Sequence, residues 1–90
     1  MSQPVAECGF PVLIASATTT TVCPAACQLL GFYLNSTTGG TIVIQDGSTA
    51  ISGTITPVIG WHSFPADIGN SLVVVTANTI SVTFFFAAAN

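Results

Sequence analysis

Short runs of strand-forming residues alternate with turn-forming residues along the whole chain, and this spacing limits the fold more than any other feature. Valine, isoleucine, threonine and phenylalanine dominate the runs, and glycine, proline, asparagine and aspartate separate them. We therefore expect an all-β fold, a small antiparallel β-sandwich or jelly-roll-like barrel of about eight short strands. The expected strands are residues 10–15, 18–22, 28–35, 41–45, 51–56, 60–65, 71–76 and 80–86.

The turn-forming residues also indicate how the strands connect. Asp46-Gly47 is the strongest signal for a two-residue hairpin in the chain. Pro11 cannot donate a ladder hydrogen bond, so the first strand is expected at an edge of a sheet. The polar run over residues 18–22 is expected at an edge as well. Further turns are expected at residues 36–40, 67–70 and 77–79.

The 90 residues include no lysine or arginine, and the only acidic residues are Glu7, Asp46 and Asp67. Soluble domains normally carry about 25% charged residues. Binding to nucleic acid and to anionic lipid depends on Lys and Arg, so we expect neither nucleic acid nor a membrane as a partner. The surface must be covered by neutral polar side chains or by other protein chains, which favours a subunit that is packed into an assembly.

The length suits a single domain, which we place at residues 8–90 after an extended N-terminal arm over residues 1–7. A domain of this size is marginally stable alone, and oligomerisation is a common remedy. The N-terminal sequence lacks the basic segment of a secretory signal, and no apolar run reaches the ~20 residues of a transmembrane helix. The chain is therefore expected to stay in the cytoplasm in which it is made.

The three cysteines, Cys8, Cys23 and Cys27, are expected to be reduced and buried, since a cytoplasmic setting disfavours disulfides. A disulfide from Cys8 to one of the other two is the alternative. The spacing of Cys23 and Cys27 is not that of a redox-active C-x-x-C pair. A zinc site formed by the three thiols and His62 is formally available, but two of the thiols lie in a Thr-rich connection. We expect neither a metal nor another cofactor.

No set of residues in the sequence suits catalysis. A Ser/His/Asp set could only be assembled from Ser63, His62 and Asp67. Adjacent residues of a strand point to opposite faces, so the side chains of His62 and Ser63 are not expected to meet. No Lys or Arg is present to stabilise a developing negative charge. We expect no enzymatic activity and assign no catalytic residue.

Two of the expected strands are apolar on both faces. Val73 and Val75 point away from their apolar neighbours in one strand, and Phe85 does so in the last strand. A strand that is apolar on both faces is covered on both faces. The second cover is either a neighbouring subunit or a loop of the same chain. Together with the large aromatic residues Trp61 and Tyr33, these side chains form the expected protein–protein interface.

Most of the chain resembles small structural proteins of tailed bacteriophages. The resemblance rests on the runs GFYLNSTTGGTIVIQDG (residues 31–47), ISGTITP (51–57) and GWHSFP (60–65), followed by a closing hairpin. It implies a head decoration or cement protein, a virion component that binds the lattice of the major capsid protein as a homo-oligomer, often a trimer. Such a protein lies on the capsid surface and passes through the host cytoplasm during assembly.

The alternative function is a host-surface glycan-binding or fibre-tip module of a phage particle. Tyr33, Trp61 and His62 are residue types that line sugar sites, because aromatic faces stack on sugar rings while neutral donors and acceptors set the orientation. This alternative requires the three side chains to form one cluster that faces solvent in the assembled particle.

Overall fold

The computed structural model describes residues 10–88, and all the regular structure in this range is β-strand. Every strand pairs antiparallel with its neighbours in one six-stranded sheet. The expected all-β fold is confirmed, with fewer strands than the sequence predicts. The expected arm over residues 1–7 lies outside the described residues. The strands are β1 (Phe10–Ile14), β2 (Thr19–Cys23), β3 (Cys27–Asp46), β4 (Thr49–Ala50), β5 (Gly60–Ile68) and β6 (Leu72–Ala88).

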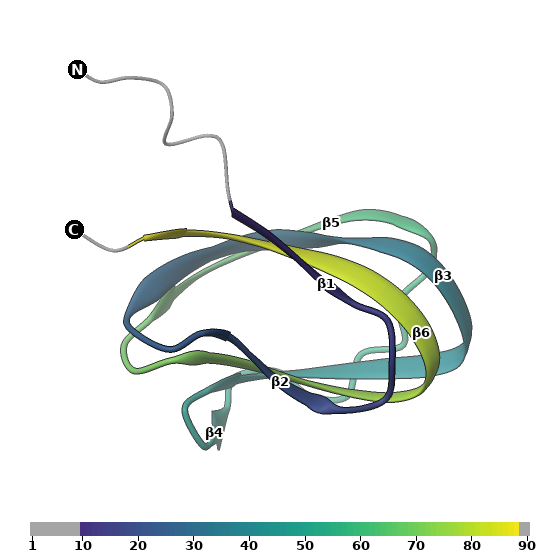
Figure 1. Cartoon of the computed structure of the whole chain (residues 1–90), viewed down its shortest axis with the longest axis horizontal. Helices are drawn as coiled ribbons and strands as arrows, with labels where there is room; N and C mark the ends of the chain where they lie inside the picture. Colours follow the sequence, from purple (N-terminus) through teal and green to yellow (C-terminus); the bar gives the residue numbers. More distant parts are fainter. Residues whose placement is uncertain (1–9, 89–90) are drawn as a thin grey trace.

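Strands β3 and β6 are by far the longest, with 20 and 17 residues, and they pair with each other along their whole length. The register runs from Cys27 opposite Ala88 to Asp46 opposite Leu72. β1 and β5 flank this pair at one end, and β2 and β4 flank it at the other. Figure 1 shows both long strands bending midway, so that the sheet curls back on itself.

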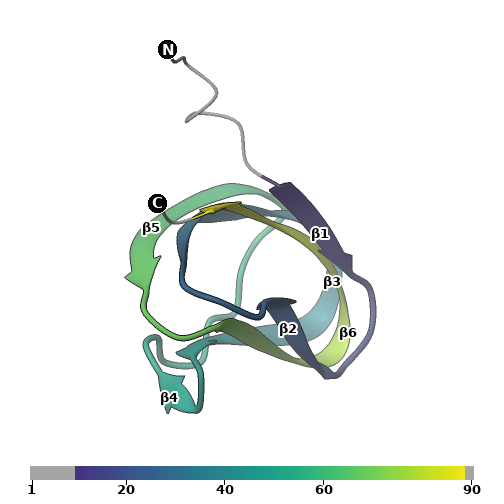
Figure 2. The same ribbon diagram turned by 60° about the vertical axis from the view of Figure 1, so that its left-hand side comes forward.

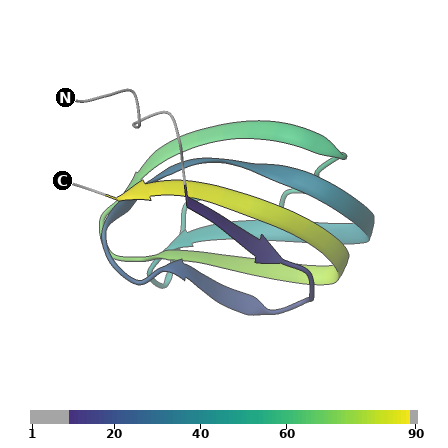
Figure 3. The same cartoon turned by 45° about the horizontal axis from the view of Figure 1, so that its top comes forward.

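The bend divides the sheet into two parts. The first half-sheet has the strand order β1-β6-β3-β5 and contains residues 27–36 of β3 and 80–88 of β6. The second half-sheet has the order β2-β6-β3-β4 and contains residues 41–46 of β3 and 72–77 of β6. Figures 2 and 3 show the two parts curving around a common interior. Each half-sheet therefore has one inward and one outward face.

Two residues in the left-handed region make the bend possible. Gly39 in β3 has a φ of 69° and Asn78 in β6 has a φ of 63°. The register shifts here, since Thr38 and Gly39 both lie opposite Thr79. The Asn78 side-chain amide donates a hydrogen bond of 2.9 Å to the Gly39 carbonyl, which ties the two bends together. Local bulges of this kind bend a strand without ending its pairing.

The prediction that the chain reverses at residues 36–40 and 77–79 is wrong. Both segments stay within a strand, so the runs 28–35 and 41–45 belong to β3, and the runs 71–76 and 80–86 belong to β6. Turn-forming residues allow a reversal but do not require one. Here the pairing of β3 with β6 continues through both segments and turns each of them into a bend.

The expectations for the edge strands and for the Asp46-Gly47 hairpin are confirmed. β1, which carries Pro11, and β2 each pair only with β6. Asp46 lies opposite Thr49 as the last residue of β3, so the two-residue loop of the hairpin is Gly47-Ser48, one residue later than the Asp46-Gly47 pair. Gly47 has the positive φ, 65°, that a tight hairpin needs. The turn expected at residues 67–70 begins later, because β5 continues to Ile68.

The strand expected at residues 51–56 is absent, since β4 ends at Ala50 and only Ile55 forms a bridge, to Ile42. The physical reason is a side chain that competes with the ladder. The Ser52 hydroxyl accepts the backbone N–H of Ile44 at 2.9 Å, which takes the place of a backbone carbonyl. Ile51, in this segment, is exposed.

The inward faces of both half-sheets enclose one hydrophobic core. Phe32 and Phe84 contact each other there, with ring centroids 5.1 Å apart. The core takes alternate residues of the strands, as the period of a β-strand requires. Within residues 10–88 no helix is long and apolar enough to cross a membrane. The fully buried side chains are Cys27, Leu29, Leu34, Ile42, Ile44, Leu72, Val74, Val82 and Phe84.

Candidate functional site

Three of the five expected interface residues lie together on the outward face of the first half-sheet. Tyr33 of β3 lies opposite Trp61 of β5, and Phe85 of β6 lies one position along, opposite Gly31 of β3. Leu13 of β1 joins them, because it shares its partner Thr83 with Tyr33. We call the four side chains Leu13, Tyr33, Trp61 and Phe85 the aromatic face.

The aromatic face is unusually exposed for side chains of this size. Leu13 is 62% exposed, Trp61 52% and Tyr33 44%, whereas Phe85 is half-buried. By register, Leu13, Thr83, Tyr33 and Trp61 form one row across the half-sheet, with neighbouring strands about 4.8 Å apart. Large exposed apolar side chains that gather in one place mark an interaction site more often than scattered ones do.

Trp61 is held in place by its neighbours rather than projecting freely. Its ring meets the ring of Phe85 edge-on, with centroids 5.6 Å apart and an interplanar angle of 65°. Beneath it lies Gly31, where an added Cβ would lie 2.8 Å from the Trp61 ring and would also collide with the backbone carbonyl of His62. The glycine therefore makes room for the indole to lie close to the sheet.

The remainder of this outward face is uncharged as far as Asp67 and includes several polar side chains. The Asn35 side chain donates hydrogen bonds to the Thr83 hydroxyl at 3.2 Å and to the Ser81 hydroxyl at 3.5 Å. These neutral groups give a partner hydrogen-bonding positions without any net charge. The face suits contact by shape, apolar area and neutral hydrogen bonds.

His62 does not belong to this face. Its register partner is Phe32, and the two rings stack with centroids 5.1 Å apart toward the core. Its Nε2 lies 2.7 Å from the carbonyl of Val58. The cluster of Tyr33, Trp61 and His62 invoked for glycan binding is therefore not brought together, and His62 and Ser63 point to opposite faces, as strand alternation predicts.

Val73 and Val75 lie on the other outward face, that of the second half-sheet. Val43 lies opposite Val75, and the three half-buried valines form what we call the valine face. Thr19 and Thr21 of β2 lie opposite Val75 and Val73 and are exposed. The five expected interface residues thus divide between two outward faces of the curled sheet.

Asp46 is engaged inside the chain. Its carboxylate accepts hydrogen bonds from the backbone N–H groups of Gly69 and Asn70, each at 2.9 Å, and from that of Ser71 at 3.4 Å. These hydrogen bonds stabilise the charged form and lower the pKa of the Asp46 carboxyl. Asp46 therefore fastens the turn between β5 and β6 and has little capacity left for a partner.

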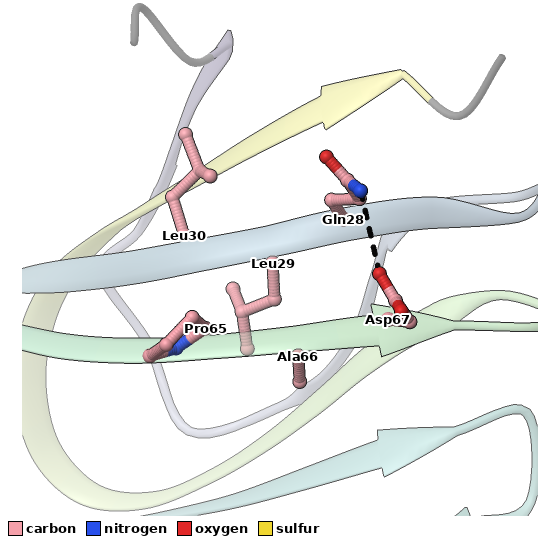
Figure 4. A pocket seen from close by; sticks show the side chains of 6 residues that line it. All are labelled: Gln28, Leu29, Leu30, Pro65, Ala66 and Asp67. Carbon is pink, nitrogen blue, oxygen red and sulfur yellow. Dashed lines mark hydrogen bonds between the residues drawn. The ribbon is translucent and has the colours of Figure 1, made fainter. Parts of the chain in front are cut away.

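Asp67 is less engaged. The Gln28 side-chain amide donates one long hydrogen bond, 3.4 Å, to an Asp67 carboxylate oxygen. Figure 4 shows both side chains among the residues that line a pocket between β3 and β5. The sequence did not indicate this pocket, because it depends on the register of the two strands and on a bulge between Leu29 and Gly31. The pocket has a volume of about 330 Å³ and is lined by Gln28, Leu29, Leu30, Pro65, Ala66 and Asp67.

Cys23 and Cys27 are both free and buried, at the two ends of the connection between β2 and β3. The Cys23 thiol donates to the Ala25 carbonyl at 3.3 Å. Burial, with the neighbouring Cys23 thiol, raises the pKa of the Cys27 thiol to about 12. Cys8 lies outside the described residues. Among residues 10–88, no three His, Cys, Asp or Glu side chains gather closely enough to hold a metal ion.

Comparisons with protein families, with curated proteins and with solved structures find no match to this chain.

Proposed function

We propose that the chain is a structural virion protein that decorates a phage capsid and docks on the lattice of the major capsid protein through its aromatic face. The observation that carries this proposal is one row across the first half-sheet, in which Leu13, Tyr33 and Trp61 are exposed and Thr83 lies between Leu13 and Tyr33. Tryptophan and tyrosine are enriched among the residues that dominate protein–protein binding. The proposal includes no catalytic step.

The fixed position of Trp61 supports a docking role. Phe85 and Gly31 already hold the indole against the sheet, so little side-chain entropy is lost when a partner covers it. A flexible aromatic side chain would lose that entropy on binding. The uncharged surroundings also let the partner come close without burying an unpaired charge.

The two outward faces suit a decoration subunit of the small β-sandwich or jelly-roll type. One face meets the capsid lattice, and the valine face on the other half-sheet meets neighbouring copies of the chain. A homo-oligomer, trimeric at a threefold position of the capsid, uses both faces at once. In this proposal the chain is made in the host cytoplasm and ends on the capsid surface.

Co-sedimentation with shells assembled from the major capsid protein of the encoding phage tests this proposal. Trp61→Ala is expected to weaken docking at least about thirtyfold, because a central aromatic anchor contributes about 2 kcal/mol or more. Val58→Ala is the matched control, since Val58 is also an exposed apolar residue, 70% exposed, but lies in the connection between β4 and β5.

The unfolding midpoint of each variant is measured alongside, because Trp61 also packs on Phe85. A folded W61A protein that docks as tightly as the wild type would refute the docking role. Wild-type protein that ignores shells but binds a host-surface glycan in a Trp61-dependent way would favour the glycan-binding or fibre-tip module instead.

A further inference from the structure

The pocket beside Asp67 continues the proposed docking face. Trp61, Ser63, Pro65 and Asp67 alternate along β5 and are all exposed, so they share its outward side. Six residues of strand place Asp67 about 20 Å from Trp61. We call the pocket formed by Gln28, Leu29, Leu30, Pro65, Ala66 and Asp67 the Asp67 notch.

No lysine or arginine of the chain can neutralise the Asp67 carboxylate. The sequence contains no lysine or arginine, so neither this molecule nor a second copy can offer a cationic Lys or Arg side chain. Gln28 supplies only one neutral and long hydrogen bond, 3.4 Å. By contrast, the Asp46 carboxylate is held by three backbone N–H groups. Of the two carboxylates within residues 10–88, Asp67 is thus the one that can still accept hydrogen bonds.

We propose that the Asp67 notch receives a lysine or arginine side chain of the protein that docks on the aromatic face. This inference rests on the proposed function and adds the chemistry of the partner. The carboxylate pairs with the cationic head, while Leu30 and Pro65 line the notch for the aliphatic stem. Long basic side chains commonly bury their stems along apolar surface in this way.

The chemistry of the notch favours a basic side chain over a metal ion. Calcium requires six or more oxygen ligands, and the notch offers one carboxylate and one side-chain amide. A Lys or Arg head needs only one carboxylate, and the apolar wall adds contacts that a bare ion cannot use. A single charged contact at one end of an otherwise neutral face also fixes the orientation in which the partner docks.

Docking to capsid shells is measured at several salt concentrations with Asp67→Asn, which removes the charge but can keep the hydrogen bond from Gln28. At low salt D67N is expected to bind about fivefold more weakly than the wild type, in line with one partly exposed ion pair. The difference disappears at about 1 M salt, where charges are screened within ~3 Å. Asp67→Lys is expected to lose more, through repulsion between like charges. Glu7→Gln is the control, because it changes the net charge equally.

The outcomes separate the two proposals. If D67N binds as tightly as the wild type with the same salt dependence, the notch holds no cation, and docking through Trp61 stands. If W61A docks normally, the proposed docking face is wrong. If wild-type protein does not dock at all, titration with N-acetyl-arginine-amide decides: NMR shifts at Gln28, Leu30 and Asp67 that vanish in D67N support the notch, and their absence refutes it.

Discussion

At the scale of single residues, Asp46 and Asp67 show how the hydrogen-bond donors around a carboxylate determine its role. Both aspartates occupy sequence positions that read as turns, and they look equivalent in the sequence. The structure gives Asp46 three backbone donors from residues 69–71 and gives Asp67 one side-chain donor. Asp46 therefore stabilises the turn between β5 and β6, and Asp67 keeps free acceptor capacity.

This difference predicts different effects of substitution. Asp46→Ala is expected to lower the thermal unfolding midpoint, because three N–H groups of the turn between β5 and β6 lose their acceptor. Asp67→Ala, the matched control, is expected to leave the midpoint almost unchanged. Circular dichroism during heating measures both. Equal midpoints for the two variants would show that Asp46 does not fasten the turn.

The same contact sets a pH dependence. The folded-state pKa of Asp46 is lowered below its ordinary 3.8, so its contribution to stability is present above that pH and is lost as the pH falls toward the folded-state pKa. The wild type is therefore expected to lose stability as the pH falls below about 3.8 toward the folded-state pKa, more steeply than D46A. Urea unfolding at each pH measures the loss, and parallel curves for the two proteins would contradict it.

At the scale of elements, the bend in β3 and β6 determines the architecture. Left-handed backbone costs an ordinary residue about 1–2 kcal/mol, and Asn tolerates it better than most. Asn78→Gly is expected to be nearly neutral, whereas Asn78→Val is expected to destabilise by about 2 kcal/mol through strain and loss of the hydrogen bond to Gly39. Urea unfolding measures both, with Thr79→Val as the control one residue on. If N78V has the same free energy of unfolding as the wild type, the backbone at the bend is not strained.

The elements predicted correctly from the sequence are those that local chemistry decides. Pro11 marks an edge strand, and Asp46-Gly47 forms its hairpin, because each depends on the conformation of a few residues. The segments 36–40 and 77–79 were mispredicted because the same turn residues either reverse or bend a strand, and the distant pairing of β3 with β6 decides between the two.

The candidate site divides in the same way. The sequence indicated Phe85 as an interface residue because it lies out of phase with the apolar face of its strand, and Tyr33 and Trp61 because they are large aromatic residues. The structure places all three on one outward face. Leu13 was missed, because its place in the row depends on a shared partner, Thr83, on another strand. The pairing of Gln28 with Asp67 likewise joins two strands, and the spacing within either strand does not reveal it.

At the scale of the whole molecule, two outward apolar faces on a small domain are expected to make the stability of the folded chain depend on association. A ligand or second copy that binds only the folded state raises the unfolding temperature with concentration. If the valine face joins copies of the chain, the midpoint is expected to rise over a roughly hundredfold increase in protein concentration. Light scattering should then give about three times the chain mass of 9.1 kDa.

The valine face can be tested by itself, because threonine is the natural neighbour of Val73 and Val75 on β2. Exchanging both valines for threonine keeps the β-branched shape and removes apolar area only on the outward side. The double variant is expected to be monomeric, with a midpoint that no longer depends on concentration, while Val58→Thr keeps the wild-type behaviour. If the double variant associates as strongly as the wild type, the copies meet elsewhere, and the aromatic face becomes the first surface to test.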